Sequence, residues 1–407
     1  MLNKIYSSEF GKGALILFMT INLYNLINFL FHFSMGRLLG PSDYGILAVL
    51  MSIVYVYNVP AEAIQNIISM YTSKFNLKNE NGKIKYLMLK SLRKGFIWSS
   101  IIVILMILPS LMLSEYLDIN FWLIFLTNIM VIFSFLVPII RGVLQGKRQF
   151  SILGFGLIID SVFKLGASIF LVIIGFKVFG AIAGVLIGVI IGIIFSLYFS
   201  REVLTSKEKY SSFKEIYSIS IPYFISMLVV LIILSLDIIL AKRFFTAEIA
   251  GKYSVVSMIG KMVFFGTIAI SKAMFPITSE KHHSNIDTSK LFIKAFTIIF
   301  FLWFISSVVF AIFPKYVIGI LYGPQYIDMA PYLIYSGIAL SFLSFSNLTL
   351  IYRLSTNSLK NYYFLFIFVF VEILLLSFFH KNILEYAITF MISNMVMFIS
   401  IFHFFKK

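Results

Sequence analysis

The sequence has 407 residues, of which 60% are hydrophobic and only 12% are charged, about half the charged share of a typical soluble domain. Its formal net charge of +16 does not indicate a nucleic-acid partner, because a nucleic-acid-binding chain would not be three-fifths apolar; basic loops beside an anionic membrane surface explain the sign better. The absence of cysteine excludes disulfides, thiol nucleophiles and thiolate metal sites.

Apolar stretches of about twenty residues, separated by short polar breaks, recur along almost the whole chain. A helix rises about 1.5 Å per residue, so each stretch can cross a hydrocarbon core about 30 Å thick. We therefore predict an all-α, polytopic membrane protein with about twelve transmembrane helices. In chain order, the predicted spans are 13–35, 44–68, 95–113, 121–140, 152–175, 179–200, 216–240, 253–274, 291–313, 331–352, 361–379 and 384–405.

Lysine and arginine are distributed unevenly between the two sets of loops that these spans create. Twelve spans place both termini on one side of the membrane. Of the 33 lysines and arginines, 23 lie on that side, counting Lys294 in the first turn of the ninth span, and 7 lie on the other. Positive charge accumulates in cytoplasmic loops. We therefore predict a multi-pass protein of the cytoplasmic membrane with both termini in the cytoplasm.

The basic segment 201–215 divides the predicted spans into six and six. The pair Arg37 and Gly45 recurs 206 positions later in the second half. Because each half has an even number of spans, the two halves have the same orientation in the membrane. We therefore expect two six-helix lobes, 1–206 and 207–407, related as parallel repeats.

Polar residues interrupt the first two spans. Asn25, Asn28 and His32 share one face of the first helix by their i, i+3, i+7 spacing. This face is either a contact between helices or the lining of a hydrophilic pathway. In the second span, Glu62 follows Pro60, which would kink the helix. No partner for Glu62 is visible nearby in the sequence, which favours a functional role.

Charged residues also occur in the fifth and seventh spans. Asp160 and Lys164 are four residues apart on the fifth span, so we expect them to pair with each other, with ion coupling as the alternative. Asp237 lies near the outer end of the seventh span. It is either a structural partner of Lys242 or Arg243, or an ion-coupling residue.

Lys261 and Lys272 lie on the eighth span, about three turns apart. A charge at the membrane centre costs about 2.5–3.5 kcal/mol, so it usually faces a partner or a wet cavity. Lys261 has no local partner, which favours a functional role, whereas Lys272 is close enough to the cytoplasmic end to extend to the interface. Glu372 is a further charge, midway along the eleventh span.

The sixth span carries a glycine at every fourth position, which permits a neighbouring helix to pack closely and need not involve a substrate. These glycines are Gly180, Gly184, Gly188 and Gly192. The sequence has no phosphate-binding loop, zinc-ligand spacing or nucleophile arrangement. It therefore predicts no enzyme, no cofactor and no metal site.

Two stretches resemble a known family. GRLLGPSDYGILAVLMSI, residues 36–53, resembles the signature that follows the first span of polysaccharide-biosynthesis exporters. DIILAKRFFTAEIAGKYSVVSM, residues 237–258, resembles the same family's aspartate late in the seventh span and the Gly-x-Tyr that opens the eighth, here Gly251 and Tyr253. The chain is thus similar to the O-antigen and lipid-linked oligosaccharide flippases of the multidrug/oligosaccharidyl-lipid/polysaccharide exporter superfamily.

This resemblance implies two six-helix lobes around a central cavity that is lined by the first, second, seventh and eighth spans and works by alternating access. The implied substrate is an undecaprenyl pyrophosphate carrying an oligosaccharide repeat unit. The protein would move it from the inner to the outer leaflet of the bacterial cytoplasmic membrane, for O-antigen, capsule or exopolysaccharide assembly. Membrane lipid, a polysaccharide polymerase and assembly proteins are the implied partners. The cavity spans here are not rich in arginine, whereas several relatives have a strongly cationic interior.

We expect amides and His32 to bind sugar hydroxyls, and Arg37, Lys261 and Lys272 to attract the pyrophosphate. The predicted substrate-binding residues are Asn25, Asn28, His32, Arg37, Glu62, Lys261 and Lys272. The predicted ion-coupling residues are Glu62, Asp160 and Asp237.

Two other functions are compatible with such a chain. A cation-coupled drug or metabolite antiporter of the same superfamily would share the architecture. A membrane polysaccharide polymerase, an enzyme, would need a sizeable outer loop bearing catalytic side chains. The longest predicted outer loop, 314–330, has about seventeen residues, which disfavours the polymerase.

Overall fold

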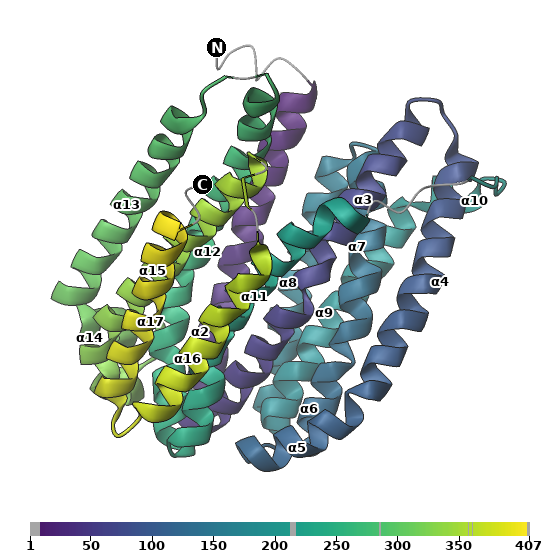
Figure 1. Cartoon of the computed structure of the whole chain (residues 1–407). Coiled ribbons are helices and arrows are strands. Elements are labelled where there is room, and N and C mark those ends of the chain that lie inside the picture. The colour runs from purple at the N-terminus through teal and green to yellow at the C-terminus, as the bar shows by residue number, and fades with distance from the viewer. Residues whose placement is uncertain (1–8, 212–216, 285, 357, 360, 405–407) are drawn as a thin grey trace. The chain divides into compact units, whose positions relative to one another are not determined.

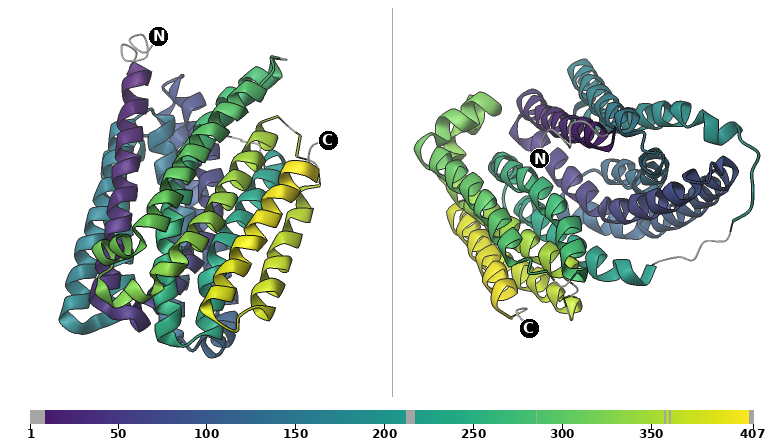
Figure 2. Two further views of the ribbon diagram at one scale, coloured as in Figure 1. Left: turned by 90° about the vertical axis from the view of Figure 1, so that its left-hand side faces the viewer. Right: turned by 90° about the horizontal axis from the view of Figure 1, so that it is seen from above.

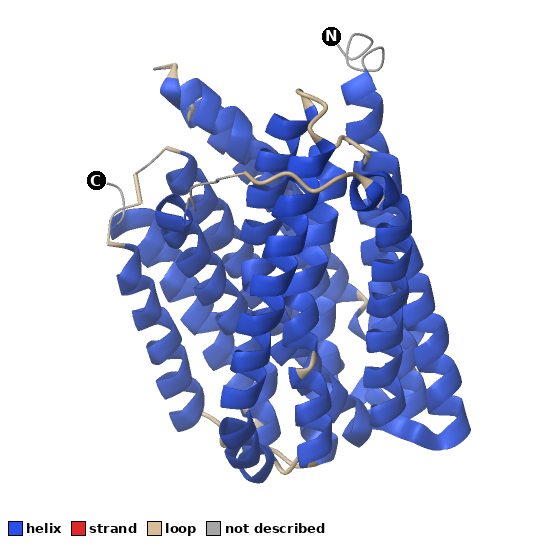
Figure 3. Ribbon diagram, turned by 90° about the vertical axis from the view of Figure 1, so that its right-hand side faces the viewer, coloured by secondary structure: helices blue, strands red, loops and turns tan. Residues whose placement is uncertain are grey.

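The computed structural model describes residues 9–211, 217–284, 286–356, 358–359 and 361–404. In this part of the chain every residue lies in a helix, a turn or a loop, and no strand occurs (Figure 3). The predicted all-α class is confirmed.

The chain forms two compact units, each of which is built from two stretches of sequence (Figure 1). Unit 1 comprises Met1–Leu39 and Tyr57–Tyr217, and unit 2 comprises Gly40–Val56 and Ser218–Lys407. The first helix, α2 (Glu9–Tyr57), leaves helical geometry at Gly40 and contributes to both units.

The remaining helices follow the division into units. Those of unit 1 are α3 (Val59–Asn76), α4 (Asn81–Leu105), α5 (Ile107–Leu117), α6 (Phe121–Asn128), α7 (Met130–Gly146), α8 (Phe150–Leu171), η1 (Val172–Phe176), α9 (Lys177–Phe199) and α10 (Arg201–Thr205). Those of unit 2, apart from Tyr217 at the start of α11, are α11 (Tyr217–Phe244), α12 (Ala247–His283), α13 (Ser289–Ile312), α14 (Pro314–Leu321), η2 (Pro324–Tyr332), α15 (Leu333–Ser355), η3 (Tyr362–Leu365), α16 (Phe366–Phe378) and α17 (Ile383–Phe404).

Among the described residues, eight helices are long and apolar enough to cross a membrane, or nine if α4 and α5, bent by 47°, form one span. Two of the eight, Met19–Asn76 and Phe150–Phe199, have 58 and 50 residues, more than twice the about 20 that one crossing needs. Each is interrupted by a glycine with positive φ, at Gly40 and Gly175 respectively, so each contains two of the predicted spans. The predicted spans lie in helices over most of their described length, with short breaks inside them at Asn58, Met106 and Ile129, as expected of a polytopic membrane protein.

The units differ from the predicted lobes, 1–206 and 207–407, in two places: Gly40–Val56 is grouped with the C-terminal helices, and unit 1 extends to Tyr217. Close backbone contact explains this grouping. A Cβ atom added to Gly45 would lie 2.8 Å from Cα of Gly251, and one added to Gly251 would lie 1.7 Å from the carbonyl oxygen of Pro41. The two glycines aligned by the sequence repeat are thus in contact with each other. A division of the chain into two continuous halves would place them in different lobes.

In unit 1, α8 and α9 pack closely through the glycines of α9. A Cβ atom at Gly184 would lie 2.2 Å from the hydroxyl of Ser168, and one at Gly188 would lie 2.5 Å from the carbonyl oxygen of Asp160. Later glycines on α9 meet earlier residues on α8, so the two helices are antiparallel. The predicted close packing of this glycine ladder is confirmed.

In unit 2, α13 packs on α12 and α15 (Figure 2). Most of its apolar residues are exposed in the structure, and Phe301 and Ile305 are 58% and 59% exposed. An apolar face of this size is unfavourable in water but suited to lipid. The described exposure therefore agrees with a membrane-spanning helix at the edge of its unit.

Candidate functional site

Unit 2 contains a buried ion pair between two neighbouring helices. Asp237 of α11 and Lys261 of α12 have no exposed side-chain surface, and Nζ lies 3.3 Å from Oδ1. The other carboxylate oxygen of Asp237 accepts a hydrogen bond from the hydroxyl of Ser257. The suggested pairing of Asp237 with Lys242 or Arg243 is therefore wrong, and Lys261, which has no partner nearby in the sequence, pairs with a residue of the neighbouring helix.

A second carboxyl group lies close to this pair. Glu372 of α16 is only 1% exposed, and one of its oxygens accepts a hydrogen bond of 2.9 Å from Ser393 of α17. The other oxygen has no partner among the described residues. Glu372 interacts electrostatically with both Asp237 and Lys261. We call Asp237, Lys261 and Glu372 the unit 2 charge cluster.

The unit 2 charge cluster holds two carboxyl groups and one ammonium group. With both carboxyls ionised its formal charge is −1, and one bound proton would bring that charge to zero. Since an unbalanced charge away from water is costly, proton uptake by this cluster is chemically reasonable. Sequence reasoning noted Glu372 but did not place it in a site, because its neighbours come from distant parts of the chain.

Unit 1 contains a second group of charges. Nη2 of Arg141, on α7, lies 2.8 Å from Oδ2 of Asp160, on α8. The ammonium of Lys164 donates instead to Oδ1 of Asn28, on α2, at 2.7 Å and lies 4.2 Å from the ring centroid of Phe31. The predicted direct ion pair of Asp160 with Lys164 does not form, although the two residues interact electrostatically. We call Arg141, Asp160 and Lys164 the unit 1 charge cluster.

The length of α7 explains the missed partner. The predicted fourth span ended at residue 140, which assigned Arg141 to a cytoplasmic loop, whereas α7 continues to Gly146. The side chain of Arg141 is 19% exposed and that of Asp160 is 8% exposed, so the pair lies within the helical bundle of unit 1.

The other predicted site residues differ in exposure. His32 is buried and meets the ring of Phe31 edge-on, with centroids 5.2 Å apart. Asn25 and Glu62 are partly exposed, and Arg37 and Lys272 are exposed. The roles of these residues in binding or coupling stay predictions, as does the central cavity that the family resemblance implies.

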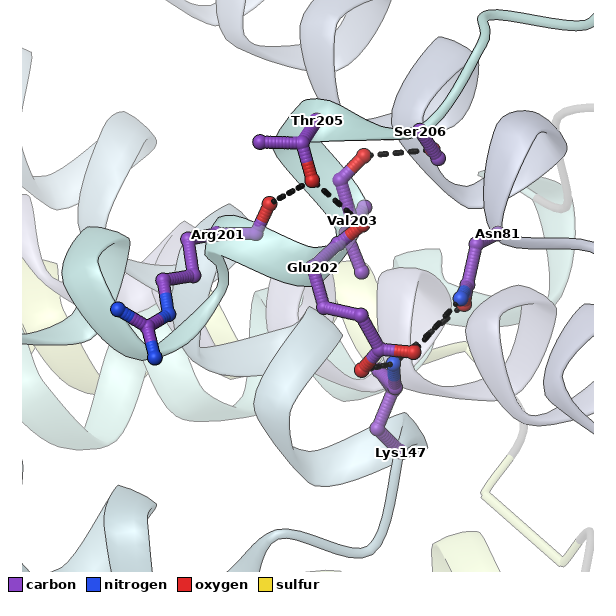
Figure 4. Close-up of polar contacts among 7 residues, drawn as sticks. All are labelled: Asn81, Lys147, Arg201, Glu202, Val203, Thr205 and Ser206. Atoms are coloured by element: carbon purple, nitrogen blue, oxygen red, sulfur yellow. Dashed lines mark hydrogen bonds and ion pairs between the residues drawn. The ribbon is translucent and has the colours of Figure 1, made fainter.

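A third polar network holds the segment after α9 onto unit 1 (Figure 4). The carboxylate of Glu202 lies 2.7 Å from Nζ of Lys147 and accepts a hydrogen bond of 2.9 Å from Asn81. These two hydrogen bonds lower the pKa of the Glu202 carboxyl below its ordinary value. We call Asn81, Lys147 and Glu202 the linker clasp.

Among the described residues, no group of three or more His, Cys, Asp or Glu side chains could hold a metal ion.

Comparison with known proteins gives a family and a fold. A family model described as polysaccharide biosynthesis protein matches residues 10–282. No match is found among curated proteins. Among solved structures, the inward-facing conformation of a multidrug resistance MATE family transporter of the MOP superfamily is 15% identical, with 94% of each chain covered and a TM-score of 0.74. A MATE structure in complex with MaD3S is 13% identical over 99% of this chain and 97% of that one, with a TM-score of 0.69.

Proposed function

The chain belongs to the polysaccharide biosynthesis protein family, and from that premise we propose that it is a flippase for lipid-linked glycans. It moves undecaprenyl-pyrophosphate-linked oligosaccharide repeat units from the inner to the outer leaflet of the bacterial cytoplasmic membrane, for O-antigen, capsule or exopolysaccharide assembly. Both termini lie in the cytoplasm. The match of the family model to residues 10–282 is the observation that carries this proposal, and the MATE-like fold is compatible with it.

Moving a glycan and a pyrophosphate through hydrocarbon is prohibitive without a polar route. In this proposal Asn25, Asn28 and His32 bind sugar hydroxyls, and Arg37 and Lys272, both exposed, attract the pyrophosphate. The polyprenyl tail stays in lipid while the protein alternates between inward and outward access.

The geometry of Lys261 favours a coupling role over the substrate contact expected from the sequence. Its ammonium has no exposed surface and is held by Asp237. In the proposed mechanism, the unit 2 charge cluster binds a coupling ion, and the change in charge alters how α11, α12 and α16 pack. Glu62 remains a second coupling candidate, and Asp160 a third, although its carboxylate is engaged by Arg141.

A flipping assay in proteoliposomes tests the proposal. Purified protein is reconstituted with a fluorescent undecaprenyl-pyrophosphate-linked disaccharide, and the fraction exposed to an external quencher is followed with time. We expect faster exposure than in protein-free vesicles, and a rate that depends on an imposed ion gradient. A rate equal to that of protein-free vesicles, under every gradient tried, would overturn the proposal.

The alternative function is export of drugs or metabolites, because one of the similar solved structures is that of a multidrug resistance MATE family transporter. The same vesicles loaded with a cationic dye distinguish the two functions. Gradient-driven dye movement without glycolipid flipping would favour the antiporter, whereas flipping without dye movement would favour the flippase.

A further inference from the structure

We infer that Lys164 is an anion-binding residue of unit 1 that contacts the oxyanion of the transported lipid-linked glycan. The inference rests on the proposed function and deepens it, because it names the residue and the charge class of the group that this residue recognises. That oxyanion is either the pyrophosphate or the carboxylate of an acidic sugar.

Lys164 makes its close contacts with neutral groups, although the carboxylate of Asp160 also interacts with its ammonium electrostatically. Asp160, the carboxylate nearest along the helix, is held by Arg141 at 2.8 Å. The ammonium of Lys164 instead meets two neutral groups, the amide oxygen of Asn28 at 2.7 Å and the ring of Phe31 at 4.2 Å. The unit 1 charge cluster therefore has a formal charge of +1.

Neighbouring helices confine the side chain and direct its ammonium group. A Cβ atom at Gly188 would lie 2.7 Å from Cβ of Lys164, so the backbone of α9 closes one side of the lysine stem. The ammonium is directed to α2, where Asn28 and Phe31 lie. Lys164 is partly exposed as a whole residue, whereas its ammonium group is enclosed by neighbouring groups, so a ligand reaches the ammonium by displacing Asn28 or Phe31.

Because Lys164 lies deep in a predicted membrane span, contacts with neutral groups alone are unfavourable for its ammonium group. The residue lies at the midpoint of the predicted span 152–175, where an ionisable side chain usually pairs with another charge or faces a polar pathway. An amide oxygen and an aromatic face bind an ammonium group more weakly than an oxyanion does. One bound negative charge would bring the unit 1 charge cluster to zero, and it would replace the contacts to Asn28 and Phe31 without breaking the pair of Arg141 and Asp160.

Binding measurements on purified, detergent-solubilised full-length protein test the inference with three probes. Undecaprenyl pyrophosphate carries the phosphate oxyanion alone, undecaprenyl glucuronide carries a sugar carboxylate alone, and undecaprenol carries neither. Lys164→Gln removes the charge, whereas Lys164→Arg keeps it. Asn28→Asp supplies a carboxylate within reach of the ammonium and so neutralises it internally. Lys207→Gln, in the exposed segment after α10, is the matched loss of one positive charge outside the spans.

We expect Lys164→Gln and Asn28→Asp each to weaken binding of one or both acidic lipids by between about tenfold and a hundredfold. Lys164→Arg should retain most of the affinity, and Lys207→Gln should bind as the unaltered protein does. The acidic lipid that responds identifies the oxyanion, and undecaprenol should respond to none of the substitutions. A merely structural lysine would lower the melting temperature of Lys164→Gln without this selectivity between probes.

Two results would overturn the inference. The first is equal affinity of Lys164→Gln and the unaltered protein for both acidic lipids. The second is equal loss of affinity for undecaprenol and the acidic lipids. The flipping assay on the unaltered protein decides the proposed function separately, so flipping together with either result would remove Lys164 from recognition and leave the flippase in place.

Discussion

The ammonium of Lys261 and the carboxylate of Asp237 have no exposed surface in unit 2. Removing two charges from water is expensive, and their attraction offsets the cost only while both are present. Ser257 donates a further hydrogen bond to Asp237, and the hydroxyl of Tyr386 donates to its main-chain oxygen at 2.7 Å. Residues of three helices therefore hold the pair in place. If either charge is removed, the other remains buried without a counter-charge.

We predict that Asp237→Ala lowers the free energy of unfolding by about 3–5 kcal/mol, because it leaves Lys261 buried and unpaired. Replacing both residues, by Asp237→Leu and Lys261→Met, should recover most of that loss but not transport. Thermal unfolding in detergent and the flipping assay measure the two effects. Asp328→Asn is the matched control. The side chain of Asp328, which pairs with Lys252, is 54% exposed, so loss of this pair should lower the free energy of unfolding by less than about 1 kcal/mol. Full flipping by the double variant would exclude a coupling role for the pair.

The two charge clusters show why pairing could not be predicted from local spacing. Asp237 and Lys261 are 24 residues apart, and Arg141 and Asp160 are 19 apart. In both cases the partners lie on different helices, so their approach depends on how the helices pack. The i, i+4 spacing of Asp160 and Lys164 made a local pair plausible, but a guanidinium from α7 occupies the carboxylate instead.

At the scale of elements, hydropathy was sufficient to place the helices. The long apolar runs predicted the all-α class and the positions of the spans, because lipid requires backbone hydrogen bonds to be satisfied within each segment. What hydropathy could not predict is where helices continue beyond the apolar run, as α7 does to include Arg141. Nor could it predict that Gly40–Val56 is grouped with unit 2, since that depends on the close approach of Gly45 and Gly251.

We predict that Gly251→Ala destabilises unit 2. The added methyl group would lie 1.7 Å from the carbonyl oxygen of Pro41, and overpacking of this kind costs about 1–3 kcal/mol or more. Gly266→Ala, on the same helix, should be neutral or slightly stabilising, because its Cβ would have nothing within 4 Å and alanine is the better helix former. Melting temperatures in detergent compare the two. Equal melting temperatures would show that α2 and α12 can separate at this point without cost.

The linker clasp should depend on pH. The pKa of Glu202 is lowered in the folded protein by Lys147 and Asn81, so its stabilising contribution is present above the unfolded value of about 4.3. That contribution is lost as the pH falls through the lower folded value. Because the side chain of Glu202 is 66% exposed, we expect an effect below about 1 kcal/mol.

A spin label at residue 205 measures this prediction. The chain has no cysteine, so Thr205→Cys gives a single labelling site next to the linker clasp. We expect label mobility to increase between about pH 5 and pH 3. Glu202→Gln should give higher mobility at neutral pH and little change with acid. Mobility that rises equally in both proteins would assign the effect to another group.

For the whole molecule, the units are joined by three stretches of chain. The backbone passes from unit 1 to unit 2 at residues 39–40, returns at 56–57 and passes again at 217–218. Two of these crossings coincide with helix breaks. Gly40 has a φ of 73°, and Asn58 and Pro60 lie at the start of α3, where proline fits the first turn of a helix but not its interior.

If alternating access moves one unit relative to the other, the crossing at Gly40 must change its backbone angles during each cycle. We predict that Gly40→Ala slows flipping several-fold, because a Cβ in this region of φ costs about 1–2 kcal/mol and narrows the conformations that the crossing can adopt. No atom lies within 4 Å of the added Cβ, so packing should be unaffected and any loss of thermal stability should come from the backbone strain alone. Gly166→Ala is the matched control, since it also has open space around its Cβ but lies inside α8. Flipping by Gly40→Ala at the rate of Gly166→Ala would show that motion between the units does not depend on this crossing.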